Sequence, residues 1–114
     1  MITLFHNPRC SKSRQTLQLL QARGIVPAVV LYLETPLDHA ALTALLKKLG
    51  IGPRQLLRSS ESAYRELGLK DPKLTDDALL AAMIEHPQLI ERPIVVNGQR
   101  AAIGRPPEAV LDIL

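Results

Sequence analysis

The sequence of 114 residues holds a single cysteine, Cys10, so the chain cannot form an internal disulfide. It has no tryptophan, one phenylalanine and two tyrosines, which argues against an aromatic platform that stacks single-stranded nucleic acid. No apolar run approaches the ~20 residues of a membrane helix, and the opening MITLFHNPRC does not follow the pattern of a signal peptide. These absences predict a protein with no membrane or nucleic-acid partner, and the lone thiol favours the reducing cytoplasm.

The remaining composition is that of an ordinary globular protein. A chain of this length predicts one domain, spanning 1–114, and 46% hydrophobic residues suffice for a core without disulfide or metal. The net charge of +3 comes from Lys and Arg residues spread along the whole chain. Such a charge is typical of a solvated surface, and it also suits a small anionic substrate.

The first third of the chain has the pattern of a strand, a helix and a second strand. The apolar stretch Ile2–His6 predicts a strand, and the leucine spacing predicts a helix over Ser11–Ala22 that Gly24 ends. The continuous apolar run Ile25–Leu33 predicts a buried strand. If the two strands are parallel, they form a βαβ unit with a right-handed crossover.

The middle of the chain, approximately residues 35–87, carries helix patterns and no strand signal, and it is predicted to be a helical insertion. Its first helix is expected to begin with Thr35 as the N-cap, Pro36 next and Asp38 at the third position, a close variant of the capping box. Leucines then recur at helical spacing up to Gly50: Leu42, Leu45, Leu46 and Leu49. Later helices are predicted over Pro53–Leu57, over Glu61–Leu67, and from the cap Thr75 to the stop at His86-Pro87.

Strand patterns return near the end of the chain. Ile94–Val96 and Gln99–Ile103 flank Asn97-Gly98, which is a strong signal for a hairpin. Pro106 and Pro107 then open a last helix that runs to the C-terminus. The predicted order is β-α-β, helical insertion, β-β-α.

The stretch FHNPRCSKSR surrounds the only thiol with positive charge. Cys10 precedes a predicted helix, whose first N–H groups and dipole favour a thiolate. Arg9, Lys12 and Arg14 add charge, and His6 adds more if it is protonated. Because the thiolate is the reactive form, the pattern favours a nucleophile, against the alternative of an inert buried cysteine. Taken alone, His6 is typical of a structural histidine at a strand end.

Several kinds of cysteine site are excluded by the neighbouring residues. A Cys-x-x-Cys pair would need a thiol at Ser13, and a Cys-x5-Arg phosphatase loop would need an arginine at Thr16. No cysteine and histidine spacing is typical of a zinc site, so no metal is predicted. A thiol that has reacted would therefore have to be restored by an external thiol.

The order of elements, with a thiol at the start of the first helix, resembles the thioredoxin fold. Segments in the right order over almost the whole chain resemble the glutaredoxin-coupled arsenate reductase family, ArsC: HNPRCSKSR, YLETP, LLR, YRELGL, LTDDAL, HPQLIERPIVV and GRPPEAVLDIL. The resemblance implies an α/β, thioredoxin-like fold with a small mixed four-stranded sheet. The helical insertion then lies between the second and third strands.

The same resemblance implies roles for individual residues. Cys10 is expected to attack arsenate, while Arg58, Arg92 and Arg105 hold the oxyanion and the covalent arseno-cysteine intermediate. His6 is expected to lower the pKa of the thiol. Near the thiol, Ser13 and Arg14 keep the family pattern, and Pro93 falls where thioredoxin-like folds have a cis-proline.

The resemblance also implies partners and leaves alternatives open. Glutathione is expected as a co-substrate rather than a bound cofactor, with glutaredoxin reducing the mixed product as arsenite leaves. Ser11 and Lys12 stand where the family has Gly-Thr, so the substrate is alternatively another oxyanion or a mixed disulfide. Spx-type regulators, which bind RNA polymerase, share the fold, although many carry the Cys-x-x-Cys that Ser13 excludes here. A domain that has lost its activity is a third alternative.

Overall fold

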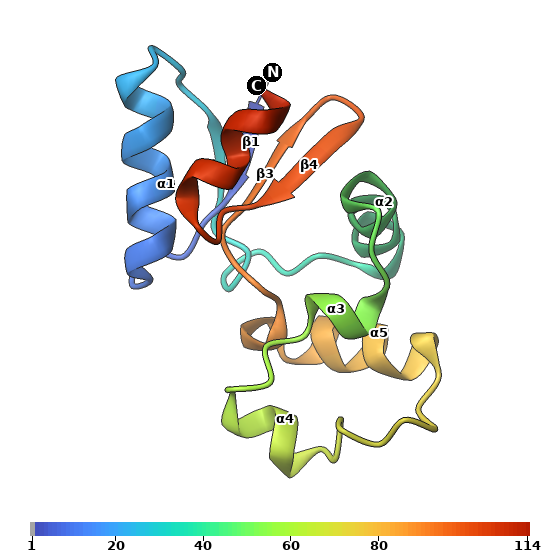
Figure 1. The fold of residues 1–114 in the computed structure, drawn as a ribbon. Coiled ribbons are helices and arrows are strands. Elements are labelled where there is room, and N and C mark those ends of the chain that lie inside the picture. Colours follow the sequence, from blue (N-terminus) through green and yellow to red (C-terminus); the bar gives the residue numbers. More distant parts are fainter. Residues whose placement is uncertain (1) are drawn as a thin grey trace. The chain divides into compact units, whose positions relative to one another are not determined.

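The computed structural model describes residues 2–114 and contains a four-stranded mixed sheet (Figure 1). The strand order is β2-β1-β3-β4. Strand β1 (Ile2–Phe5) pairs in parallel with β2 (Ala28–Val30) and antiparallel with β3 (Ile94–Asn97), which pairs antiparallel with β4 (Arg100–Ile103). The predicted thioredoxin-like sheet is confirmed, including its mixed direction.

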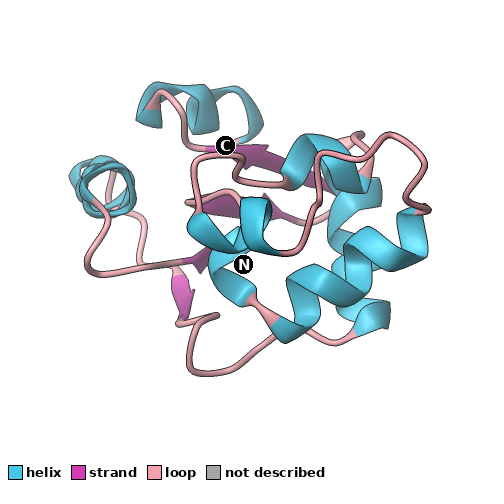
Figure 2. Cartoon of the chain, turned by 90° about the horizontal axis from the view of Figure 1, so that it is seen from below, coloured by secondary structure: helices cyan, strands magenta, loops and turns pink. Residues whose placement is uncertain are grey.

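The chain divides into two compact units. One comprises the residues up to Thr35 together with Arg92–Leu114 and holds the sheet; the other is Pro36–Glu91. Between β2 and β3 the named elements are all helices, which confirms the helical insertion; Figure 2 distinguishes helices, strands and loops by colour. The interpretation of residues 1–114 as a single domain, with an insertion over 35–87, stays a prediction.

The core of the sheet-containing unit lies on one face of the sheet. Leu4 and Val95 face each other across β1 and β3, and both side chains are fully buried. The helix α1 (Ser11–Ala22) adds Leu20, and the C-terminal η2 (Pro107–Ile113) adds Val110. The predicted last helix is a seven-residue 3₁₀ helix, longer than such runs usually are.

The second strand differs from its prediction. Only Ala28–Val30 pair with β1, and this strand is exposed rather than buried, with Val29 45% exposed. The reason is that β2 is an edge strand with one hydrogen-bonded neighbour. Pro27 precedes it without an N–H to donate to a ladder, and Val26 is 92% exposed. The run of apolar β-branched residues therefore predicted a strand correctly, but it did not predict whether that strand is buried.

The second unit packs around one helix. Helix α5 (Asp76–Glu85) contacts α2 (His39–Leu49), α3 (Pro53–Leu56) and η1 (Pro87–Leu89), while α4 (Ser62–Glu66) follows α3. The helical spacing predicted for α2 is confirmed, since Leu42, Leu45 and Leu46 are buried and Leu49 is half-buried. The other elements of this unit also bury apolar side chains: Leu56, Leu79, Leu80, Met83 and Leu89.

The start of α2 was predicted three residues too early. Its N-cap is Asp38, whose carboxylate accepts a hydrogen bond of 2.8 Å from the N–H of Ala41. Thr35 instead belongs to the preceding turn, in which its N–H donates to the carbonyl of Leu31. A carboxylate at the N-cap also interacts favourably with the helix dipole, which explains why Asp38 takes the position.

The hairpin between β3 and β4 forms one residue later than its signal. Asn97 pairs with Arg100, so the two loop residues are Gly98 and Gln99. Gly98 has φ +63°, the conformation required at the first position of a type II′ turn. The glycine therefore fixes the turn, while Asn97 ends the strand.

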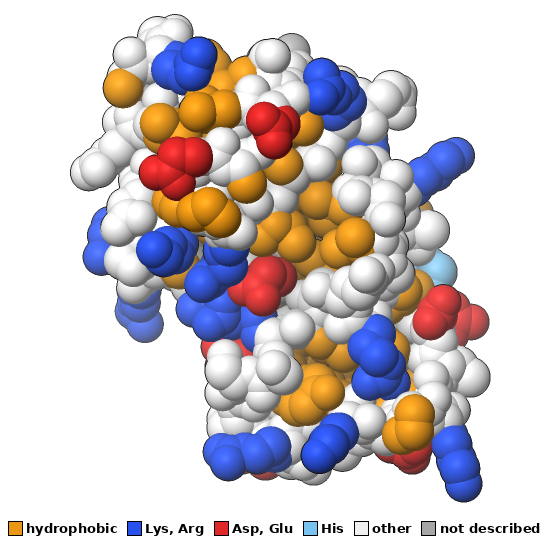
Figure 3. Space-filling model, viewed as in Figure 1, with side chains coloured by type: hydrophobic (Ala, Val, Ile, Leu, Met, Phe, Trp, Pro, Cys, Tyr) orange, Lys and Arg blue, Asp and Glu red, His pale blue; other side chains and the backbone are white. Residues whose placement is uncertain are grey.

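The surface carries charges of both signs. On the face shown in Figure 3, Lys and Arg side chains lie over both units and are interspersed with Asp and Glu. Within residues 2–114, no helix is both long enough and apolar enough to cross a bilayer.

The corrected cap yields a stability test. Replacing Asp38 with alanine removes the acceptor for the Ala41 N–H, and should lower the free energy of unfolding by about 1 kcal/mol, within the 0.5–2 kcal/mol of N-cap losses. Thr35→Ala is the matched control and should change it by less than about 0.5 kcal/mol. Urea denaturation measures both, and a larger loss for Thr35→Ala would contradict the assignment.

Candidate active site

The thiol of Cys10 lies at the junction of β1 and α1. Cys10 is the N-cap residue of α1, with extended backbone angles of φ −95° and ψ 123°. Its N–H donates to the carbonyl of Asn7, and its carbonyl accepts from the N–H of Arg14, each at 3.0 Å. The residue is only 8% exposed. The structure thus confirms the predicted position at the helix start and adds that most of the cysteine is covered.

Two arginines distant in sequence reach this sulfur. Arg105 Nη2 lies 3.6 Å from Cys10 Sγ, and Arg105 Nε donates a 2.7 Å hydrogen bond to the carbonyl oxygen of Arg92. The guanidinium group of Arg92 also acts on the sulfur, because its hydrogen bonding and its charge lower the pKa of the thiol. Because Arg92 precedes β3 and Arg105 follows β4, the β-hairpin brings both guanidinium groups to one thiol.

Gly104 makes this approach sterically feasible. Its N–H donates a 2.9 Å hydrogen bond to the carbonyl of Pro93, so it extends the pairing of β3 with β4. A Cβ at this position would lie 2.6 Å from Thr16 Oγ1 of α1 and 2.7 Å from Pro93 Cγ. Sequence reasoning missed Gly104 and Thr16 as site residues. The available signal was a glycine directly before the proposed oxyanion ligand Arg105.

Opposing effects set the pKa of Cys10, which is lowered overall. Burial is the largest effect and raises the pKa, because it disfavours the charged form. The backbone N–H of Ser13, the hydrogen bond and charge of Arg92, and the N–H of Lys12 lower it and together outweigh burial. The sulfur of Cys10 does not form a regular capping hydrogen bond, so these two N–H groups interact with it at longer range or poorer angle. The thiolate is therefore favoured, as the sequence predicted.

Next to the thiol, Ser13 and His6 form a buried polar pair. Ser13 Oγ lies 2.6 Å from His6 Nδ1 and accepts a 3.1 Å hydrogen bond from the N–H of Asn7. Because Ser13 is fully buried, its hydroxyl hydrogen needs an acceptor, and Nδ1 provides it. This assigns the His6 proton to Nε2. Ser13 thus holds the His6–Asn7 segment onto the first turn of α1.

The charge of His6 depends on its burial and on Arg14. Burial, and secondarily the positive charge of Arg14, lower the pKa of His6, so the imidazole is disfavoured as a cation. The positive charge that His6 would add if protonated is therefore disfavoured, because the ring is buried and Arg14 repels the cation. The expectation that His6 lowers the pKa of the thiol stays a prediction. Arg14 Nη1 donates a 2.9 Å hydrogen bond to the carbonyl of Pro8, which braces the loop before Cys10.

The peptide bond between Arg92 and Pro93 is cis, which confirms that expectation. The Arg105–Pro106 bond is also cis, and the sequence analysis did not anticipate it. Each of these prolines follows an arginine of the site. Arg105 contacts the sulfur of Cys10, and the carbonyl oxygen of Arg92 accepts a hydrogen bond from Arg105.

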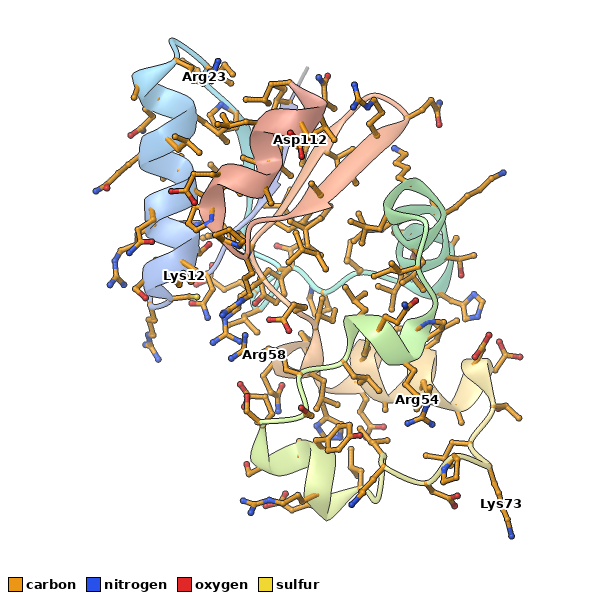
Figure 4. The ribbon with its side chains drawn as sticks, viewed as in Figure 1. Lys12, Arg23, Arg54, Arg58, Lys73 and Asp112 are labelled. Carbon is orange, nitrogen blue, oxygen red and sulfur yellow. The ribbon has the colours of Figure 1, made fainter. Side chains whose placement is uncertain are left out.

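Arg58 belongs to the second unit, where it follows α3 (Figure 4). Its Nη1 lies 2.8 Å from Glu91 Oε1, and its Nε lies 3.5 Å from Glu61 Oε1. Within that unit Arg58 is thus held by two carboxylates, and its part in an oxyanion site stays a prediction. In the described part of the chain, no cluster of three or more His, Cys, Asp or Glu side chains could hold a metal ion.

Comparison with known proteins places the chain in a family. The sequence model of the ArsC family matches residues 5–113. The chain belongs to the ArsC family. It is 50% identical to an arsenate reductase of Neisseria meningitidis, over 99% of this chain and 97% of that protein. It is 55% identical to the uncharacterized protein YfgD of Escherichia coli, over 99% and 96%.

A solved structure is similar in fold and sequence. The arsenate reductase from Vibrio cholerae superposes on this ArsC-family chain with a TM-score of 0.97 and 54% identity, covering 99% of this chain and 97% of that one. The chain and these relatives therefore correspond over their full lengths.

The site brings together a nucleophile and cations that fit an anion. A sulfur stabilised as a thiolate lies beside two guanidinium groups, whose forks match tetrahedral oxyanions. Such an arrangement can neutralise an anionic substrate while the thiolate attacks it.

The charge balance at Cys10 predicts a shift in reactivity with pH. In the wild type, the midpoint of iodoacetamide alkylation should lie below the ~8.5 of a free cysteine. Arg92→Gln removes a hydrogen bond and a charge from the thiolate, so the midpoint should move to higher pH. Arg23→Gln, at the opposite end of α1 from Lys12 (Figure 4), is the control and should leave it unchanged. Equal midpoints for wild type and Arg92→Gln would contradict this account.

The close packing at Gly104 predicts a steric effect. Gly104→Ala should lower the free energy of unfolding by about 1–3 kcal/mol, because the added methyl overpacks against Thr16 and Pro93. It should also raise the alkylation midpoint of Cys10 by displacing Arg105. Gly52→Ala is the control, since a Cβ at this position would lie 4.0 Å from the nearest atom, Gln55 Oε1. An alanine tolerated at 104 as readily as at 52 would show that these contacts relax freely.

Proposed function

We propose that this protein is a glutathione- and glutaredoxin-dependent arsenate reductase. The observation that carries the proposal is the Cys10 thiol, favoured as a thiolate and lying 3.6 Å from a guanidinium nitrogen of Arg105. Relatives about 50% identical over their full length are named arsenate reductases, which supports the same substrate here.

The charge of the substrate explains why several cations are needed. Arsenate is a tetrahedral anion at neutral pH, and a thiolate that approaches it meets like charge. Arg92 and Arg105 neutralise both partners and offer paired N–H donors to the arsenate oxygens. Arg58 is proposed as the third donor, contributed by the segment after α3.

In the first step, Cys10 forms a covalent bond with arsenic. The sulfur forms an As–S bond as one As–O bond breaks, and the departing oxygen takes up protons and leaves as water. Arsenic remains As(V) in this arseno-cysteine intermediate. The guanidinium groups stabilise the charge that develops on the remaining oxygens.

External thiols then supply the two electrons, because the chain has no second cysteine. The glutathione thiolate replaces another oxygen on arsenic, which again leaves as water. The glutaredoxin thiolate attacks the glutathione sulfur and forms an S–S bond, and the electron pair of the broken As–S bond reduces arsenic to As(III). Water displaces Cys10, arsenite leaves and the thiolate is restored. Since Cys10 must stay reduced, we propose the cytoplasm as its location.

A coupled assay tests the proposal. With arsenate, glutathione, glutaredoxin, glutathione reductase and NADPH, the wild type should consume NADPH in an arsenate-dependent manner. Cys10→Ser should abolish turnover, because the nucleophile is lost. Arg105→Ala should lower kcat/KM about 10²–10³-fold, the usual cost of removing one preorganised donor. Arg23→Ala, an exposed arginine of the same unit, is the control and should behave as the wild type.

Two results would contradict the proposal. Turnover that persists in Cys10→Ser would exclude the covalent step. No arsenate-dependent turnover in the wild type, together with retention of RNA polymerase in a pull-down, would favour an Spx-type regulator. Activity with a different oxyanion or a mixed disulfide in the same assay would change the substrate and keep the roles of Cys10 and Arg105.

A further inference from the structure

A cavity of about 280 Å³ lies in the sheet-containing unit, next to the loop that leads into Cys10. It is lined by residues 6–9 and by Leu31, Leu33 and Glu34. We propose that this cavity binds the γ-glutamyl end of glutathione, with its free ammonium and carboxylate groups. The inference rests on the proposed function, since it locates the thiol that resolves the Cys10 intermediate.

The place of the cavity relative to the sheet is set by two strands. Strands β1 and β2 are parallel, and the cavity is formed by the segments that follow their carboxyl ends. The N–H of His6 donates a 2.9 Å hydrogen bond to the carbonyl of Val30, which joins the two segments where they leave the sheet. The cavity therefore lies outside the carboxyl ends of the one parallel pair of strands in the sheet. There it borders the loop carrying the nucleophile.

Two opposite charges meet at this cavity. Arg9 and Glu34 both line it and are exposed, and neither forms an ion pair with another residue of the range 2–114. A ligand that satisfies both must carry an anionic and a cationic group. The α-amino acid group of the γ-glutamyl residue does, with its carboxylate for Arg9 and its ammonium for Glu34.

The remaining walls suit the rest of such a residue. Leu31, Leu33 and Pro8 offer an apolar surface to its methylene groups. His6 Nδ1 is engaged by Ser13, so His6 Nε2–H is the donor that the ring can offer to a ligand. The volume lies below the ~300 Å³ at which pockets hold drug-sized ligands, so the cavity fits one end of the tripeptide. The cysteinyl part would extend along residues 7–9 toward Cys10.

Charge also separates this cavity from the oxyanion site. Arsenate carries no cationic group, and the carboxylate of Glu34 disfavours it. The two ligands therefore have separate places on the same unit, as the formation of a ternary thiol–arsenic adduct requires.

Binding of S-methylglutathione, whose sulfur cannot react, tests the inference without any turnover. In ¹⁵N-labelled protein it should shift the amide resonances of His6, Asn7, Arg9 and residues 31–34. Glu34→Gln and Arg9→Gln should each raise the dissociation constant of S-methylglutathione about tenfold. The double reversal Arg9→Glu with Glu34→Arg should recover part of the lost affinity. Glu108→Gln, an exposed carboxylate of the same unit, is the matched control and should bind as the wild type.

Steady-state kinetics supply the second arm. Glu34→Gln should raise the KM for glutathione about tenfold and leave the KM for arsenate within twofold. Shifts confined to residues around Arg92 and Arg105, no binding at 10 mM S-methylglutathione, or an unchanged KM in Glu34→Gln would each overturn the inference. If S-methylglutathione binds this cavity while the wild type shows no arsenate turnover, the proposed function fails and the binding site stands.

Discussion

The stabilisation of a negative charge on a largely buried sulfur is the constraint around which the sheet-containing unit is built. Burial opposes ionisation of Cys10, so the favourable contacts have to outweigh it together. Two come from backbone N–H groups at the start of α1, which cost no side chain and remain in place as long as the helix forms. The others come from arginines on segments about 80 to 95 residues away in sequence. The fold therefore ties reactivity to the complete assembly of the sheet.

The hairpin of β3 and β4 places these two arginines beside the sulfur. Pairing continues past the strands, because Gly104 binds the carbonyl of Pro93 and Arg105 binds that of Arg92. The absence of a side chain at Gly104 lets this segment approach Thr16 of α1 closely. Close packing and charge stabilisation therefore depend on neighbouring residues, since Gly104, which permits the packing, directly precedes Arg105, which contacts the sulfur.

The buried pair of Ser13 and His6 organises the other side of the cysteine loop. The imidazole, held through Nδ1, fixes the His6–Asn7 backbone against α1, and His6 also lines the cavity formed by residues 6–9, Leu31, Leu33 and Glu34. The network therefore positions the loop rather than adding charge to the thiol. Because the chain has one cysteine, the second thiol has to come from another molecule. A cavity beside that loop, lined by charges of both signs, would orient this molecule toward Cys10.

Local patterns in the sequence determined the type and order of the elements, because spacing of apolar residues and the chemistry of turns act over a few residues. The leucines of α1 and α2, the glycine of the hairpin and the placement of Cys10 before α1 are of this kind. The family resemblance added Arg92, Arg105 and the cis peptide bond at Pro93, which no local pattern marks. What only the tertiary structure decided were properties that depend on neighbours from elsewhere in the chain. The edge position exposed β2, burial and the charge of Arg14 lowered the pKa of His6, and the side chains of Thr16 and Pro93 left no room for a Cβ at Gly104.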